Sequence, residues 1–418
     1  MSTEVAESDF AIDSKQSATL GDAARDYRNR VKGGDMGSLP AVAGLFVLII
    51  VFSFANDRFL STLNIANLFT QAGAICVLAM GLIPVLLVGD IDLSAGVAGG
   101  MSACITALMI VNKGQQWYVA VAVGLAVGAL LGLVIGLLVA RLGIPSFVVT
   151  LAFFLAIQGV SLKLIGQGGS LRVADPVLRG LTINNVPLTL GWTMAVGSVA
   201  AYAAILLLRY RRQVAGGLQH QPLSVLLVKI TGMAVLLLGA TALLSTNRSL
   251  NPNFPISGIP YFVPIVGVLL VFWTFVFGRT AYGRHLYAVG GNIEAARRAG
   301  INTLRMRVSA FIICSTMAAI SGILAASYTG KVSPSSGAGN TLLYAVGAAV
   351  IGGTSLFGGK GKAQDAVVGG LVIATIANGL GLLNQASYIN YLVTGGVLLV
   401  AASVDAISRR RRSAAGIG

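Results

Sequence analysis

Long apolar segments fill most of this 418-residue chain, separated by short breaks rich in charge, glycine, proline or asparagine. A bilayer core is about 30 Å thick, so a helix that crosses it needs about 20 apolar residues. Twelve blocks approach this length, centred on residues 41–55, 66–88, 94–111, 117–140, 146–165, 191–208, 224–245, 261–278, 308–328, 342–353, 365–384 and 390–406. They predict an all-α bundle of about twelve transmembrane helices, in which the short block 342–353 is tilted or re-entrant.

The basic residues lie at the edges of these blocks, although a net charge of +15 would by itself also suggest a nucleic-acid partner. With the N-terminus inside, the inner side collects most of them: Arg25 to Lys32, Arg141, Arg209, Arg211, Arg212, Arg279, Arg284, Arg297, Arg298, Arg305, Arg307, Lys360, Lys362 and Arg409 to Arg412. Basic residues concentrate in cytoplasmic loops, so this asymmetry predicts an even number of spans with both termini inside and a lipid bilayer, not nucleic acid, as the surroundings.

Three segments follow from this division. Residues 1–38 have no apolar stretch near Met1 and predict a polar cytoplasmic tail, not a signal peptide. Residues 39–408 form the transmembrane domain, and residues 409–418 form a basic cytoplasmic tail.

The composition provides few residues that could bind a metal ion or carry out covalent chemistry. Only 10% of residues are charged, compared with about 25% in soluble proteins. The three cysteines stand singly inside apolar segments, with no C-x-x-C spacing, and are expected to be buried. His220 and His285 are expected in polar cytoplasmic loops. No metal site is therefore predicted, and no Ser, His, Asp or Cys, His set suggests a membrane enzyme.

Glycine is abundant, and one predicted helix carries four glycines at four-residue spacing: Gly124, Gly128, Gly132 and Gly136. Membrane helices tolerate single glycines, but four in register form a groove that another helix backbone can approach. This register favours close helix packing.

The loop after the eighth block contains a short predicted helix. Asn292 is a suitable N-cap after Gly291, and Glu294 favours the positive end of the helix. Ala295 and Ala296 are small, Arg297 is charged, and Gly300 allows a stop. This pattern suits a helix that docks into a groove on another protein, and equally an ordinary basic loop against anionic lipid.

Two further stretches are unusual. Asp90 and Asp92 stand with Ser94 between apolar blocks, where a carboxylate needs a partner, a cavity or an interface. Capping of the third span and a gate structure are favoured over proton coupling. A second stretch holds Gly352, Gly353, Gly358 and Gly359, followed by Lys360 and Gly361. It does not match a P-loop, because position 354 is Thr and Ser or Thr does not follow Lys360, so it predicts a sharp connection between helices.

These motifs carry a resemblance. Glu294, Ala295, Ala296 and Gly300 are similar to the coupling motif of ABC importer permeases, and residues 290–301 look like its version in the ribose and xylose sugar-permease family. Residues 89–96 and 352–361 continue the resemblance, which spans about 40–166 and 261–406.

The resemblance implies a homodimeric permease of the bacterial inner membrane. In that family the loop at Glu294 to Gly300 fits a cleft on a separate ATP-binding subunit. That subunit uses ATP and Mg, so this chain binds no cofactor itself. An extracytoplasmic sugar-binding protein delivers the monosaccharide. Residues about 170–255 hold an additional helix pair that compact ribose-type members lack and xylose-type members resemble, which favours D-xylose or a similar aldose.

Two other transport functions stay open. A branched-chain amino acid permease is the nearest alternative, and an ion-coupled transporter is disfavoured because the helix interiors hold almost no ionisable residues. A sugar pathway needs polar and aromatic side chains, but the sequence does not distinguish which of its candidates face it: Asn64, Gln71, Asn378, Asn384 or Tyr344.

Overall fold

The computed structural model describes residues 37–217, 221–249 and 255–414, with Gly21, Arg25, Asn251 and Asn253 in addition. Most of the predicted N-terminal tail, His220 and the last four residues of the predicted C-terminal tail lie outside the described residues. Internal contacts divide the chain into two compact units. The larger comprises Gly37–Val186 and Arg248–Ile407, and the smaller comprises Met1–Met36, Pro187–Asn247 and Ser408–Gly418.

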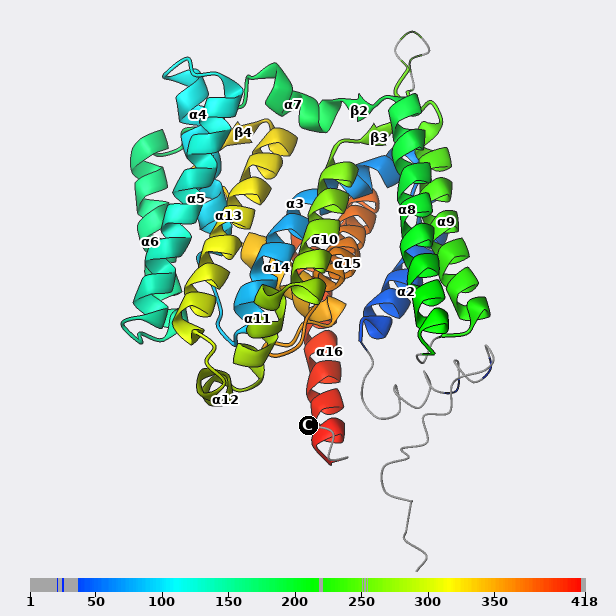
Figure 1. The fold of residues 1–418 in the computed structure, drawn as a ribbon. Coiled ribbons are helices and arrows are strands. Elements are labelled where there is room, and N and C mark those ends of the chain that lie inside the picture. Colours follow the sequence, from blue (N-terminus) through cyan, green and yellow to red (C-terminus); the bar gives the residue numbers. More distant parts are fainter. Residues whose placement is uncertain are drawn as a thin grey trace, which may run out of the picture. The chain divides into compact units, whose positions relative to one another are not determined.

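The larger unit is a bundle of apolar helices joined by short connections (Figure 1). Its long helices are α2 (Leu39–Ala55), α3 (Thr62–Leu87), α4 (Ala95–Val111), α5 (Trp117–Ala140), α6 (Ser146–Ile165), α10 (Phe262–Arg279), α13 (Thr303–Thr329), α14 (Thr341–Gly352), α15 (Ala363–Leu382) and α16 (Ser387–Ala414), the last of which continues beyond this unit. Three shorter helices are α7 (Pro176–Ile183), α11 (Ala281–Gly291) and α12 (Ile293–Arg298).

Helix α3 forms the centre of the bundle and packs against α10, α13, α14 and α15. Its large side chains from Leu78 to Leu87 are almost completely buried. By contrast, α5, α6 and α10 expose apolar side chains such as Leu155 and Val271, which is the surface expected where helices meet lipid. The core therefore surrounds α3.

At one end of the bundle, two short antiparallel ladders connect distant segments. Strand β1 (Leu171–Arg172) pairs with β4 (Lys331–Val332), and β2 (Asn185–Val186) pairs with β3 (Ile259–Pro260). Helix α7 lies between β1 and β2 in the chain, and the Asp175 carboxylate caps it by accepting from the N–H groups of Val177 and Leu178 at 2.9 and 3.1 Å. Arg179 Nη1 donates to Ser327 O at 2.9 Å, which fastens α7 to α13.

The described part of the smaller unit consists mainly of α8 (Leu188–Ala215) and α9 (Leu223–Ser245), which pack side by side (Figure 1). Prolines precede both helices, at positions where the missing N–H is not needed. These two helices correspond to the additional pair expected between residues 170 and 255.

Every one of the twelve predicted blocks coincides with a helix among the described residues. Within the described part of the chain, eight helices are long and apolar enough to cross a membrane, and four shorter apolar helices cover the remaining blocks: Leu39–Ala55, Ala95–Val111, Thr341–Gly352 and Ser387–Val400. The chain is thus a multi-pass helical membrane protein.

One prediction is wrong: His285 does not lie in a loop. It lies within α11, which forms because the Thr280 hydroxyl accepts from Gly283 N–H at 3.2 Å and because Leu286 and Val289 bury one face of the helix. The three cysteines are free and buried.

Candidate functional site

Three of the sequence motifs meet at one backbone junction, formed by Leu87, Gly89, Gly290, Gly358 and Gly359. Gly359 N–H donates to Leu87 O at 2.9 Å, which joins the loop after α14 to the end of α3. Gly290, near the end of α11, lies so close to both that a Cβ atom there would overlap Leu87 O and lie 2.6 Å from Gly359 N. The ends of α3 and α11 therefore hold the loop that follows α14.

Glycine is required in this loop for its backbone conformation as well as for space. Gly358 and Gly359 have φ of +87° and +70°, in the region that residues with a Cβ rarely adopt. At the start of the loop, Gly353 has φ of +118°, and a Cβ on Gly352 would overlap the backbone of Asp365. The stretch is a tight connection between α14 and α15.

Asp365 closes the other end of this connection. Its Oδ2 accepts from Lys362 N–H at 2.8 Å and from the Thr354 hydroxyl at 3.2 Å. Tyr287 of α11 reaches across and donates its hydroxyl hydrogen to Gly361 O at 2.5 Å. The loop is thus held by side chains as well as by the junction.

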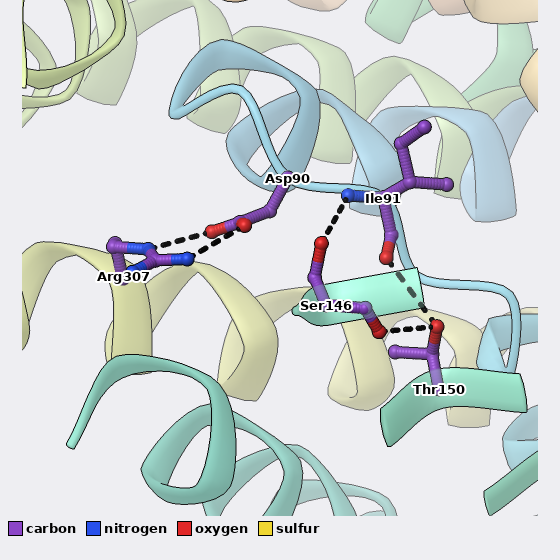
Figure 2. A network of polar contacts seen from close by, with 5 residues as sticks. All are labelled: Asp90, Ile91, Ser146, Thr150 and Arg307. Carbon is purple, nitrogen blue, oxygen red and sulfur yellow. Dashed lines mark hydrogen bonds and ion pairs between the residues drawn. The ribbon is translucent and has the colours of Figure 1, made fainter. Parts of the chain in front are cut away.

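A buried ion pair fixes the segment between α3 and α4 to α13. Arg307 donates from Nε to Asp90 Oδ2 and from Nη2 to Asp90 Oδ1, both at 2.8 Å, in the bidentate geometry shown in Figure 2. The side chain of Asp90 is 7% exposed and that of Arg307 is 23% exposed. A carboxylate in this apolar setting needs a partner, and Arg307 supplies it.

Helix α6 contacts the next residue of the same segment. Ile91 N–H donates to Ser146 Oγ at 3.4 Å, and Thr150 Oγ1 lies 3.4 Å from Ile91 O and 2.8 Å from Ser146 O (Figure 2). Two long helices, α6 and α13, therefore hold the segment from opposite sides.

Asp92 is completely buried in this connection. Its Oδ1 accepts from the N–H and the hydroxyl of Ser94 at 2.9 and 2.6 Å. Ser94, not Asp92, takes the N-cap position of α4. Asp92 Oδ2 makes no hydrogen bond of ordinary length to any described residue, although the thiol of Cys314 faces the carboxyl. Burial raises the pKa of Asp92 above its ordinary value.

Helix α12 presents the most exposed part of the site. Asn292 Oδ1 accepts from Ala295 N–H at 2.9 Å, which caps the helix, and Gly300 ends it with φ of +81°. Of α12 itself, Ala296 alone is buried, and the other residues from Gly291 to Gly300 are exposed. Glu294 and Arg297 form a solvent-exposed ion pair at 2.6 Å. The helix leads directly into α13 and hence to Arg307.

The glycine register on α5 lies away from this junction. A Cβ on Gly124 would overlap Thr106 of α4, and a Cβ on Gly132 would overlap the backbone of Phe311 in α13. Gly128 and Gly136 face α13 in the same way. The register is where α5 approaches its neighbours most closely.

The residues that sequence reasoning missed are the partners across the chain. Ser146 and Thr150 give no signal in an apolar block, because hydroxyls commonly bond to their own helix backbone. Arg307 is one of the basic residues predicted on the inner side. Its pairing could have been suspected, because Asp90 requires a cation nearby. Among the described residues, no group of three or more His, Cys, Asp or Glu side chains is placed to hold a metal ion.

Comparison with known proteins places the chain among transport permeases. Residues 64–402 match a family model described as "Branched-chain amino acid transport system / permease component". The xylose transport system permease protein of Escherichia coli strain K12 is 33% identical over 373 residues, covering 88% of this chain and 92% of the relative. Its Haemophilus influenzae namesake is 35% identical over 369 residues, covering 87% and 95%.

A ribose import permease protein of Bacillus subtilis is 31% identical over 388 residues, covering 91% of this chain and 95% of the relative. No solved structure matches the chain.

Proposed function

The chain belongs to the permease family of branched-chain amino acid transport systems, and from this premise we propose that it is the membrane subunit of an ABC importer for a monosaccharide. The family title names amino acids, whereas the relatives with the matches described above are named for xylose and ribose. Two relatives named for xylose match about nine tenths of the chain at 33% and 35% identity, which supports D-xylose or a similar aldose as the proposed substrate. The chain is a transport subunit of the bacterial inner membrane, not an enzyme.

The observation that carries the proposal is the convergence of three motifs beside an exposed helix. Helix α12 is free to dock on a partner, and its two ends continue into α11 and α13. Through Gly290 and Arg307, those helices contact the connections that end α3 and precede α15. A displacement of α12 would therefore reach the central helix of the bundle.

The partner at α12 is proposed to be a separate ATP-binding subunit. That subunit would use ATP and Mg, so this chain itself would bind no cofactor. An extracytoplasmic sugar-binding protein would deliver the substrate to the opposite side. The importer would contain two copies of this chain, because a pair of ATP-binding subunits needs two docking helices.

The proposed topology has twelve spans with both termini in the cytoplasm. It keeps residues 1–38 and 409–418 as cytoplasmic tails and treats the helix pair within about 170–255 as inserted. The continuity of α16 to Ala414 supports a helical start to the second tail.

The docking role can be tested with Glu294→Arg. Charge reversal on an exposed docking helix should abolish ATP-driven sugar uptake and weaken capture of the ATP-binding subunit, while insertion into the membrane stays intact. The matched control is Lys113→Glu, a charge reversal in the exposed α4–α5 connection. Normal uptake by Glu294→Arg would reject the assignment.

The substrate class has its own test. The purified complex should show ATPase activity that rises with a binding protein loaded with D-xylose. A rise only with a leucine-loaded binding protein would support the amino acid importer instead.

A further inference from the structure

Two asparagines form a closed amide pair inside the larger unit. Asn64 of α3 donates to Asn378 Oδ1 at 2.8 Å, and Asn378 of α15 donates to Asn64 Oδ1 at 2.9 Å. Asn64 also donates to Phe59 O at 2.9 Å, and both side chains are buried. The pair joins the beginning of α3 to the last part of α15, two helices that pack against each other.

Gln71 is oriented by this pair but not satisfied by it. Its Oε1 accepts from Asn378 Nδ2 at 3.5 Å, and its amide nitrogen carries two further N–H donors. Neither donor has a hydrogen-bond partner among the described residues, and the side chain is half-buried. Asn67, four residues earlier and thus on the same helix face, is exposed.

This face cannot be a lipid face. At 1.5 Å of rise per residue, Gln71 lies roughly 14 Å along α3 from Thr62, which is about the middle of a bilayer core about 30 Å thick. Amide groups in hydrocarbon would lose their hydrogen bonds, so they face water or another polar group. The lipid-type surface of α10, with Val268 and Val271, is apolar by comparison.

The chemistry of the face indicates what it would bind. Primary amides donate and accept hydrogen bonds, which suits the alternating donor and acceptor character of sugar hydroxyls. Helix α3 has no Asp, Glu, Lys or Arg, and in α15 Asp365 is the only one, at the far end from Asn378. A zwitterionic amino acid would find no countercharge on these two helices.

We propose that Asn67 and Gln71, positioned by the Asn64–Asn378 pair, form a hydroxyl-binding step for an uncharged monosaccharide on the route through the membrane. This inference rests on the proposed function, because it needs a sugar to pass. The monosaccharide then passes along the exposed face of α3, a helix that is otherwise buried. In this proposal Gln71 binds the substrate, whereas Asn64 and Asn378 hold Gln71 in position.

Thiol labelling tests the route without requiring transport. Gln71→Cys and Asn67→Cys should react with a membrane-impermeant maleimide at least tenfold faster than Val268→Cys on the lipid-type face, and D-xylose should slow the reaction. The native cysteines are buried and give the background. Equal slow labelling of all three variants, or a disulfide between two copies through position 71, would overturn the route and indicate lipid or subunit contact.

Transport by the reconstituted complex tests the chemistry. Gln71→Leu should reduce D-xylose uptake about tenfold or more while the ATPase activity stimulated by loaded binding protein persists. The matched control is Gln158→Leu, which removes an amide from α6. Unchanged uptake by Gln71→Leu, in a complex whose wild type imports D-xylose, would reject the binding step and leave the proposed function standing. Wild-type import of L-leucine alone would reject both.

Discussion

Arg307 and Glu294 belong to two ion pairs that differ in burial, and this difference determines how much each pair contributes to the stability of the fold. The Asp90–Arg307 pair is largely enclosed, so Arg307→Ala would leave a buried carboxylate without its cation. Loss of one partner from a buried pair costs about 3–5 kcal/mol, and the partial exposure of Arg307 places the expected loss near the lower end. The melting temperature of the purified protein should therefore fall clearly.

The exposed pair provides the control for this prediction. Glu294 and Arg297 have side chains 56% and 68% exposed, so Arg297→Ala should leave the melting temperature almost unchanged. Equal melting temperatures for Arg307→Ala and Arg297→Ala would show that Asp90 finds another partner.

The burial of Asp92 predicts that the free energy of unfolding changes with pH in a definite direction. Burial raises its folded-state pKa above the ordinary 3.8, so the folded protein holds this proton more tightly than the unfolded chain does. The free energy of unfolding should then fall as pH rises from about 4 through the folded-state pKa. Asp92→Asn cannot ionise, so its melting temperature minus that of the wild type should grow between pH 4 and neutral pH.

A constant difference across that range would contradict the prediction. It would mean that Asp92 is ionised in the folded state at every pH measured, with the carboxylate stabilised by Ser94.

Single residues with local partners were predictable from the sequence. Asn292 caps α12 as expected, because an N-cap interaction involves residues only three apart. The partner of Asp90 lies 217 residues away, and periodicity carries no information about such a contact. The sequence could say that Asp90 needs a cation, but several arginines on the inner side were available.

At the scale of elements, two adjacent glycines of α11 differ in their surroundings. A Cβ on Gly290 would overlap Leu87 O, whereas nothing lies within 4 Å of a Cβ on Gly291. Gly290→Ala should therefore push α11 away from the end of α3, lower the melting temperature and abolish stimulation of the ATP-binding subunit. Differential scanning fluorimetry and stimulated ATPase activity would measure the two effects.

Gly291→Ala serves as the matched control, since it makes the same chemical change one residue later. It should keep both the melting temperature and the stimulation near wild type. If both variants behave alike, close approach at Gly290 has no role in the junction.

The helices of the structure show which elements the apolar pattern of the sequence can predict and which it cannot. The apolar blocks located the long helices, because a span of about 20 apolar residues is a strong signal. Helix α11 was missed, since its end is Gly290–Gly291, which has low helix propensity, and its stability comes from the Thr280 cap and from packing. Tertiary contact here outweighed local preference.

For the whole molecule, the sequence predicted the class of fold and two helices within residues 170–255, which are α8 and α9. It could not predict that residues 89–96, 290–301 and 352–361 would meet, because that contact depends on how the helices pack. Family resemblance ordered these motifs along the chain without placing them together in space. The junction is therefore a property of the folded bundle.

The division into two units leads to the last prediction. The pair α8 and α9 belongs to the smaller unit, and the larger unit resumes at Arg248. Arg248 donates to Asn185 Oδ1 at 3.2 Å and to Gly258 O at 2.9 Å, so the chain ends that flank the pair are held together without it. A short glycine-serine linker from Val186 to Arg248 should therefore close the gap with little strain.

This deletion should insert into the membrane, melt close to the wild type and keep sugar uptake, because the junction, α12 and the Asn64–Asn378 pair all lie in the larger unit. The control is a deletion of the same residues combined with Arg248→Ala. That control also removes the side-chain hydrogen bonds of Arg248, although the β2–β3 ladder stays, and it should melt at a lower temperature. Loss of uptake by the first deletion, with its melting temperature preserved, would instead make the helix pair part of the transport mechanism.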